Sequence, residues 1–175
     1  MGRVLKRVPQ VPWGVLTDSL GPARDIPPLL SRVAWGDEAT ASAAIDELGD
    51  RVCSLGFVVS EATAHVVPFL VELAGDSTVH GRAEILDLVS RIHAAREWES
   101  TARIAPGKYA DGYQEKIAWE AASRAAVLAG TGVFQSLLDD PDTGVAKAAR
   151  ALVAAMPVSL PAGSAHEVWC SVGGA

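Results

Sequence analysis

A histidine, two acidic residues and an arginine recur at helical spacing in the middle of the chain. The residues at positions i, i+4, i+7 and i+11 are His80, Glu84, Asp87 and Arg91. On one helix they would share a face, and His80 with Glu84 could supply two ligands to a divalent cation. The pattern has no third ligand, and a solvated helix face carries the same mixture of charges. We therefore assign no metal site and treat these four residues as a candidate partner-binding face.

The remaining histidines and the glycines complete no catalytic or cofactor motif. His65 could act as a general base, but the sequence places no Ser or Cys nucleophile beside it. His166 and Cys170 form a His-x-x-x-Cys pair that lacks the second half of a zinc site. The glycines form neither a P-loop nor a dinucleotide-binding fingerprint. We assign no catalytic residue and no cofactor, and we favour a function other than catalysis.

Aromatic and basic residues gather in a second stretch, where Trp98 is followed by Lys108, Tyr109, Tyr113 and Lys116. Such a mixture can contact nucleic acid. The chain, however, has 15 Lys and Arg against 21 Asp and Glu, a net charge of −6, which opposes binding to a polyanion. An exposed Trp or Tyr is also a common anchor of protein interfaces. We therefore add Trp98, Tyr109 and Tyr113 to the candidate partner-binding residues.

Amphipathic helices must position these side chains, because apolar residues recur with a period of 3.6 along most of the chain. Apolar residues make up 49 % of the sequence and aromatic residues only 6 %, which favours helices over a β-sandwich. The expected helices cover 26–35, 38–52, a helix hairpin over 60–92 broken at 75–78, then 113–129, 133–138 and 144–156. This is an all-α fold of about seven helices.

Polar residues before several apolar runs predict where these helices begin. The expected N-caps are Asp25, Asp37, Ser60 and either Asp142 or Thr143. Residues 53–59 are apolar, but we expect a connector there, because a lone strand would have no partner. Residues 94–112 hold charged residues, Pro and Gly, and we expect a long loop with a frayed helical end.

Residues 113–129 have a strong amphipathic pattern that predicts a helix. We expect its core-facing residues to be Ile117, Ala121, Ala125 and Leu128. Glu120 and Arg124 stand four residues apart in the order that favours an ion pair along a helix.

Sequence composition also predicts the domain boundaries and the location of the protein. We expect an irregular lead-in over 1–21, a helical domain over 22–156 with an insertion loop at about 95–112, and a flexible tail over 157–175. The lead-in could pack through Trp13, which would cover one end of the core. No apolar run approaches the about 20 residues that cross a bilayer, and prolines interrupt the segment after the charged start. We expect no signal peptide, no membrane contact, a cytoplasmic location, and reduced thiols at Cys53 and Cys170.

Three segments share one pattern, in which an apolar helix ends, an Asp-containing turn follows and a second helix begins. They cover 34–48, 74–88 and 138–153. A single helix hairpin cannot bury its apolar face, whereas stacked hairpins can, which favours a solenoid over a bundle. The spacings are uneven, so the repeat would be imperfect, with an insertion.

The last segment resembles a HEAT repeat, through the sequence LLDDPD at 137–142 followed by VAKAARAL at 145–152. HEAT repeats often continue with Val-Arg after the Asp-Pro turn; here Ala146 and Lys147 stand at that place. GPA at 21–23, DIP at 25–27, EAT at 61–63 and VPFL at 67–70 resemble bacterial, actinobacterial-type HEAT proteins. Those proteins often carry His-Gln-Gly before the Glu-Ala-Thr segment, and only the Gly of Ser54-Leu55-Gly56 matches.

This resemblance implies a right-handed HEAT-like α-solenoid and says little about function, because the same fold carries many functions. We expect a non-catalytic scaffold that binds a protein partner through its helical-repeat surface. An acidic helical protein also fits an immunity protein that neutralises a cationic bacterial toxin. A nucleic-acid-acting repeat protein and a small enzyme that uses the His80 face remain open alternatives. The sequence does not predict the oligomeric state.

Overall fold

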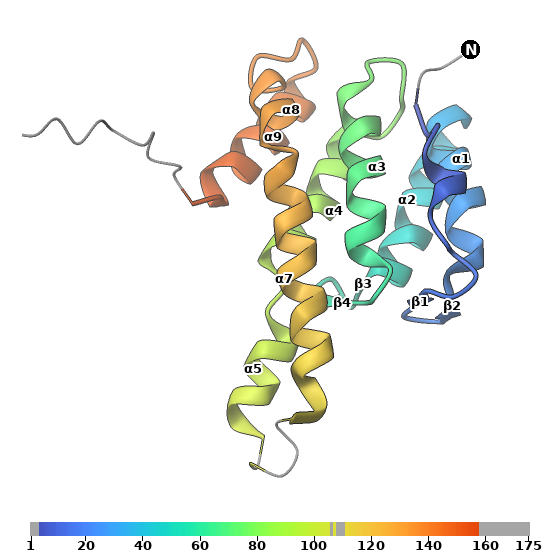
Figure 1. The fold of residues 1–175 in the computed structure, drawn as a ribbon. Helices are drawn as coiled ribbons and strands as arrows, with labels where there is room; N and C mark the ends of the chain where they lie inside the picture. The colour runs from blue at the N-terminus through green and yellow to red at the C-terminus, as the bar shows by residue number, and fades with distance from the viewer. Residues whose placement is uncertain (1–3, 106, 108–110, 158–175) are drawn as a thin grey trace, which may run out of the picture.

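The computed structural model describes residues 4–105, 107 and 111–157 (Figure 1), and these residues are predominantly helical. The expectation of an all-α fold is therefore confirmed. The α-helices are α1 (Ile26–Trp35), α2 (Glu38–Val52), α3 (Thr63–Gly75), α4 (Arg82–Ala94), α5 (Glu97–Ile104), α7 (Gln114–Ala129), α8 (Thr131–Ser136) and α9 (Thr143–Ala155). Short 3-10 turns lie at Val8–Gln10, Ala23–Asp25 and Asp111–Tyr113.

The long helices form two layers of antiparallel pairs (Figure 1). One layer contains α1, α3 and α7 side by side, and the other contains α2, α4 and α9. Helix α1 packs on α2 and α3 on α4, while α7 also contacts α4. The first turns of α7, together with α5, extend past the ends of α3 and α4 (Figure 1). The core lies between the layers, where its largest side chains are Leu, Ile and Phe with almost no exposed surface.

The first two predicted repeat segments each contain a helix end, a turn and a helix start, which join α1 to α2 and α3 to α4. The third, 138–153, begins after the end of α8 at Ser136 and contains only the turn and the start of α9. Asp37 accepts a hydrogen bond from the Thr40 amide at 2.9 Å, so its predicted N-cap role is confirmed. Asp142 caps α9 by accepting from the Gly144 amide at 2.8 Å. Asp76 instead closes its own turn, because the residue before α4 is Gly81, with φ of 71°.

Two short antiparallel hairpins lie at the same end of the molecule as α5 (Figure 1). Strands β1 (Thr17–Asp18) and β2 (Gly21–Pro22) pair within the lead-in, and β3 (Cys53–Ser54) pairs with β4 (Val58–Val59). The prediction that the 53–59 connector has no strand partner is therefore wrong, because the connector folds back and pairs with itself. Trp13 is buried against Phe69, with ring centroids 6.2 Å apart, as expected of a residue that covers one end of the core.

Two of the predicted caps are wrong. Helix α3 begins at Thr63 rather than beside Ser60, whose hydroxyl donates to the carbonyl oxygen of Arg51. Asp25 does precede α1, but its carboxylate makes no cap and accepts from the Arg51 guanidinium at 3.0 Å instead. In both cases a distant residue offers the side chain a better partner than the adjacent helix does.

Residues 97–104 form helix α5, where the sequence predicted a loop. A buried carboxylate from α7 explains this difference. Glu120, with 1 % of its surface exposed, accepts from the amides of Trp98 at 2.8 Å and Glu99 at 3.1 Å. It therefore satisfies two of the free N–H groups at the start of α5. This cap comes from a residue more than 20 positions away, so no local pattern announces it.

The predicted core face of α7 is also wrong. The buried residues are Glu120, Ser123 and Val127, whereas Ala121, Ala125 and Leu128 are exposed. Ile117 is half-buried. The predicted ion pair between Glu120 and Arg124 does not form, because Glu120 turns to α5 and Arg124 donates to the carbonyl oxygen of Ala95.

A buried ion pair joins the start of α4 to the turn between α8 and α9. Arg82, at the start of α4, binds both carboxylate oxygens of Asp140 in the α8–α9 turn, with Nη2–Oδ2 at 2.7 Å. Its Nε also donates to the carbonyl oxygen of Ala74 at 2.9 Å. The hydrogen bond from Arg82 lowers the pKa of Asp140. None of the helices in the described residues is long and apolar enough to cross a membrane.

Candidate interaction surface

Helices α2 and α4 are neighbours, and each of them exposes a polar face to solvent. Ile45 and Leu48 of α2 are buried, as is Leu88 of α4, so the charged positions between them must point outward. Gly49 of α2 lies next to Leu88 of α4, because a Cβ at position 49 would be in ordinary van der Waals contact with Leu88 at 3.7 Å. The two polar faces therefore lie close enough to form one surface.

A hydrogen bond joins the two faces directly, because the Ser42 hydroxyl donates to Glu84 Oε2 at 2.9 Å. We call this surface the acidic groove and define it by Ser42, Asp46 and Asp50 of α2 and Glu84, Asp87 and Arg91 of α4. The exposed acidic residues of each helix are spaced three or four apart, which keeps them on one face. At its far end the groove opens into a hollow of about 290 Å³, lined by Asp46, Asp50 and Arg91.

The charges of the acidic groove are not balanced within the described residues. Four carboxylates stand with a single guanidinium, that of Arg91, and all five groups are exposed. Across the described ranges, none of them takes part in an ion pair. The groove is thus a region of negative potential that rests on a rigid pair of packed helices.

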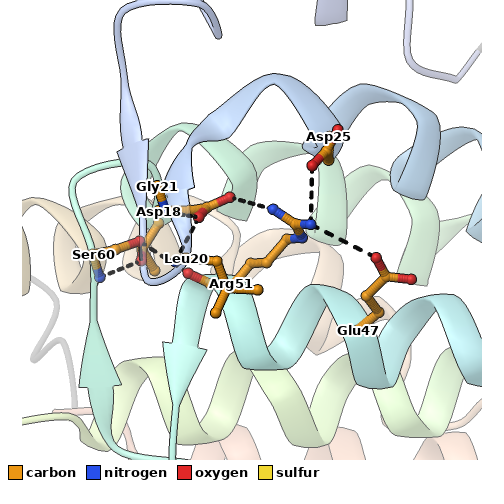
Figure 2. A network of polar contacts seen from close by, with 8 residues as sticks. Asp18, Leu20, Gly21, Asp25, Glu47, Arg51 and Ser60 are labelled. Atoms are coloured by element: carbon orange, nitrogen blue, oxygen red, sulfur yellow. Dashed lines mark hydrogen bonds and ion pairs between the residues drawn. The ribbon is translucent and has the colours of Figure 1, made fainter.

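The adjacent face of α2 carries a second charge network, in which the carboxylates share a cationic partner (Figure 2). Arg51 lies between Asp18 and Asp25, with N–O distances of 3.0 Å to each, and 3.8 Å from Glu47. Asp18 also accepts from the amides of Leu20 and Gly21, which close the turn between β1 and β2. This network joins the lead-in to α2, and we assign it a structural role.

His80 belongs to the predicted site but does not lie on α4. Gly81, in a left-handed conformation, separates it from the helix, which begins at Arg82. The assumed i, i+4 relation to Glu84 therefore does not hold. His80 instead lines a hollow of about 420 Å³ with Glu38 and the Arg82 ion pair, beyond the near end of the acidic groove.

Trp98 and Tyr113 form a separate cluster at the end of the molecule that carries α5. Their rings stack with centroids 6.2 Å apart, and Lys116 Nζ lies 4.2 Å from the Trp98 centroid. The Trp98 indole N–H donates to the carbonyl oxygen of Val59 at 3.0 Å, so this ring is held in place by the β4 strand. Tyr109 lies outside the described residues. The structure thus brings Trp98 and Tyr113 together but places them apart from the α4 face.

Metal and thiol chemistry find no support in the described part of the chain. It contains no group of three or more His, Cys, Asp or Glu side chains that could hold a metal ion. Burial raises the pKa of the Cys53 thiol to about 11, so this cysteine is a poor nucleophile near neutral pH. His166 and Cys170 lie outside the described residues.

Sequence reasoning identified Glu84, Asp87 and Arg91 but missed Asp46 and Asp50. The signal was present, because Ser42, Asp46 and Asp50 repeat every four residues along a helix that was predicted correctly. The sequence did not show that α2 and α4 are neighbours in the fold. Comparisons of the chain with family models, curated proteins and solved structures found no match.

Proposed function

We propose that this protein is a non-catalytic interaction module that binds a cationic segment of a protein partner along the acidic groove. The observation that carries the proposal is the contrast between two neighbouring faces of α2. Carboxylates on one face are paired with Arg51, whereas those of the groove have no ion-pair partner in the described residues. A lysine- or arginine-rich segment would supply the missing charge.

The surrounding architecture supports a binding surface of this kind. The groove lies on the layer formed by α2, α4 and α9, and the core behind it is closely packed. A rigid surface loses little conformational entropy on binding, and its charge accelerates encounter with an oppositely charged partner. Helix pairs packed side by side in two layers are also compatible with a HEAT-like solenoid, which we retain as part of the proposal.

Neutralisation of a cationic bacterial toxin is a second candidate, favoured by the net charge of −6 and the same groove. In that case the bound segment would belong to the active or binding surface of the toxin. It would predict stoichiometric inhibition that is lost when the groove is neutralised. A scaffold would bind its partner without inhibiting it.

The experiment is a titration with a fluorescently labelled octalysine peptide at low and at physiological salt. The groove variant Glu84→Gln/Asp87→Asn should bind the peptide several-fold more weakly than the native protein. The matched control Glu115→Gln/Asp139→Asn removes the same charge from exposed positions elsewhere, on α7 and in the turn after α8. Amide NMR shifts on addition of the peptide should concentrate on α2 and α4.

Two results would contradict the proposal. One is equal weakening by the groove variant and its control, which would show that only net charge matters. The other is a set of NMR shifts spread over the whole surface rather than along α2 and α4. Melting curves of both variants should match that of the native protein, because the substituted side chains are exposed.

A further inference from the structure

A third hollow, of about 650 Å³, lies where the end of α4 meets α7 and the end of α9. We call it the basic hollow. Its walls combine the basic side chains of His93, Arg96 and Arg124 with an apolar patch formed by Ala125, Leu128 and Met156. Its volume lies within the range of about 300–1,000 Å³ that is typical of small-molecule sites.

Two guanidinium groups converge in this hollow. Arg96 Nη1 donates to the carbonyl oxygen of Ala95 at 2.8 Å, and Arg124 Nη1 donates to the same oxygen at 3.3 Å. Burial lowers the pKa of Arg96 first, and the neighbouring positive charge of Arg124 lowers it further. The two cations therefore repel one another across a single neutral acceptor.

Nearby carboxylates balance this charge only in part. Glu99 Oε2 lies 4.0 Å from Arg124 Nη2, at the limit of an ion pair. Glu120 is committed to the two amides at the start of α5. Arg96 takes part in no ion pair within the described ranges, and each guanidinium has five N–H donors, of which few are used here. An anion placed between the two arginines would find free donors in a fork geometry.

His93 adds a buried polar atom with unused hydrogen-bonding capacity. The residue has 6 % of its surface exposed, and no described residue bonds to its Nδ1. Burial lowers the pKa of His93, a backbone hydrogen bond with Ala155 partly opposes this, and the charges of Arg96 and Arg124 lower it further. An unsatisfied buried polar atom is costly, and it is found where a ligand or water supplies the partner.

The other wall of the hollow is apolar because α7 turns its alanine stripe away from the core. Ala125 and Leu128 are exposed there, and Met156 stands at the end of α9. An inorganic anion would use the arginines and leave this wall in contact with water. A ligand that binds the arginines and also covers the apolar wall must combine a negatively charged group with a hydrocarbon chain.

We infer that the basic hollow binds the carboxylate of an amphiphilic organic acid. The carboxylate lies between Arg96 and Arg124, and the hydrocarbon chain lies along Ala125, Leu128 and Met156. This site is distinct from the acidic groove, which has the opposite charge and lies between α2 and α4.

Calorimetric titration with octanoate tests the inference on the full chain. Octanol has the chain without the charge and acetate has the charge without the chain, so both should bind at least ten-fold more weakly. Arg96→Gln and Arg124→Gln should each reduce octanoate affinity about ten-fold, as expected for the loss of a charge-assisted hydrogen bond. Arg103→Gln is the matched control, because Arg103 lies exposed on α5, outside the hollow.

A variant at an exposed position guards against misfolding as the explanation. Ala125→Glu places a carboxylate inside the hollow and should abolish octanoate binding while leaving the melting temperature unchanged. The groove variant Glu84→Gln/Asp87→Asn should bind octanoate normally, which separates this site from the proposed protein-binding function. Absence of octanoate binding at millimolar concentration would overturn the inference, as would equal loss in Arg96→Gln and Arg103→Gln.

Discussion

Replacement of Arg51 by Met tests whether the network in Figure 2 holds the lead-in to the helical domain. The Asp18 side chain has no exposed surface and that of Arg51 has 12 %. Arg51→Met keeps most of the hydrocarbon stem but leaves the Asp18 carboxylate buried without a countercharge. Breaking one side of a buried ion pair costs about 3–5 kcal/mol.

The lower end of that range applies here. Asp18 keeps its hydrogen bonds from the amides of Leu20 and Gly21, and Arg51 Nε has no partner within the described residues. We therefore expect Arg51→Met to lower the free energy of unfolding by about 3 kcal/mol. For a domain of this size, that corresponds to a decrease of about 6–12 °C in the melting temperature.

Arg32→Met is the matched control. Arg32 forms an ion pair with Glu47 at 3.2 Å, but the side chains are 44 % and 46 % exposed. Such a surface pair contributes about 0–1 kcal/mol. In the double variant Asp18→Asn/Arg51→Met the buried charge is gone, so the loss should be smaller than the sum of the two single losses.

Urea unfolding followed by circular dichroism compares the native protein with Arg51→Met, Arg32→Met, the single variant Asp18→Asn and the double variant. The reasoning would be refuted if Arg51→Met were no more destabilising than Arg32→Met. It would also fail if the losses in the double variant were simply additive, because the argument rests on one carboxylate losing its only countercharge.

Two further predictions concern a helix start and a thiol. Glu120→Ala should remove the cap of α5, lower the free energy of unfolding by about 1–3 kcal/mol and speed amide hydrogen exchange in residues 97–104. The exposed Glu115→Ala on the same helix is its control, and unchanged exchange in α5 would contradict the capping role. In a Cys170→Ser variant, Cys53 should react with a disulfide reagent about 100-fold more slowly than a thiol with the ordinary pKa of 9.0, because burial raises its pKa to about 11. The rate of this reaction should rise with pH and in denaturant. Rapid reaction of Cys53 in the folded protein at pH 8 would contradict the burial of its thiol.

The start of each helix could be predicted where its cap is local. Asp37 and Asp142 lie directly before α2 and α9, and their carboxylates reach amides two or three residues ahead. Ser60 and Asp25 are also of residue types that often cap helices, but their side chains bond to Arg51, which is near in space and not adjacent in the sequence. A cap motif therefore predicts a helix start only when no competing partner exists.

The candidate sites were less predictable than the helices. Glu84, Asp87 and Arg91 could be assigned to one exposed face from their spacing alone. Asp46 and Asp50 joined them only once α2 was seen beside α4. The basic hollow was missed because its arginines come from the junction between α4 and α5 and from the middle of α7, with no common pattern in the sequence.

The class of fold was predictable from the sequence alone, because a 3.6-residue period of apolar positions is a local property of each helix. The sequence also determined the positions of most helices and the acidic character of the surface. The tertiary structure decided which way α7 faces and whether α5 forms at all. Both depend on Glu120, whose carboxylate is stable in the interior only where the amides of Trp98 and Glu99 meet it. A periodic pattern gives the faces of a helix, but the neighbours that satisfy its polar groups decide which face is buried.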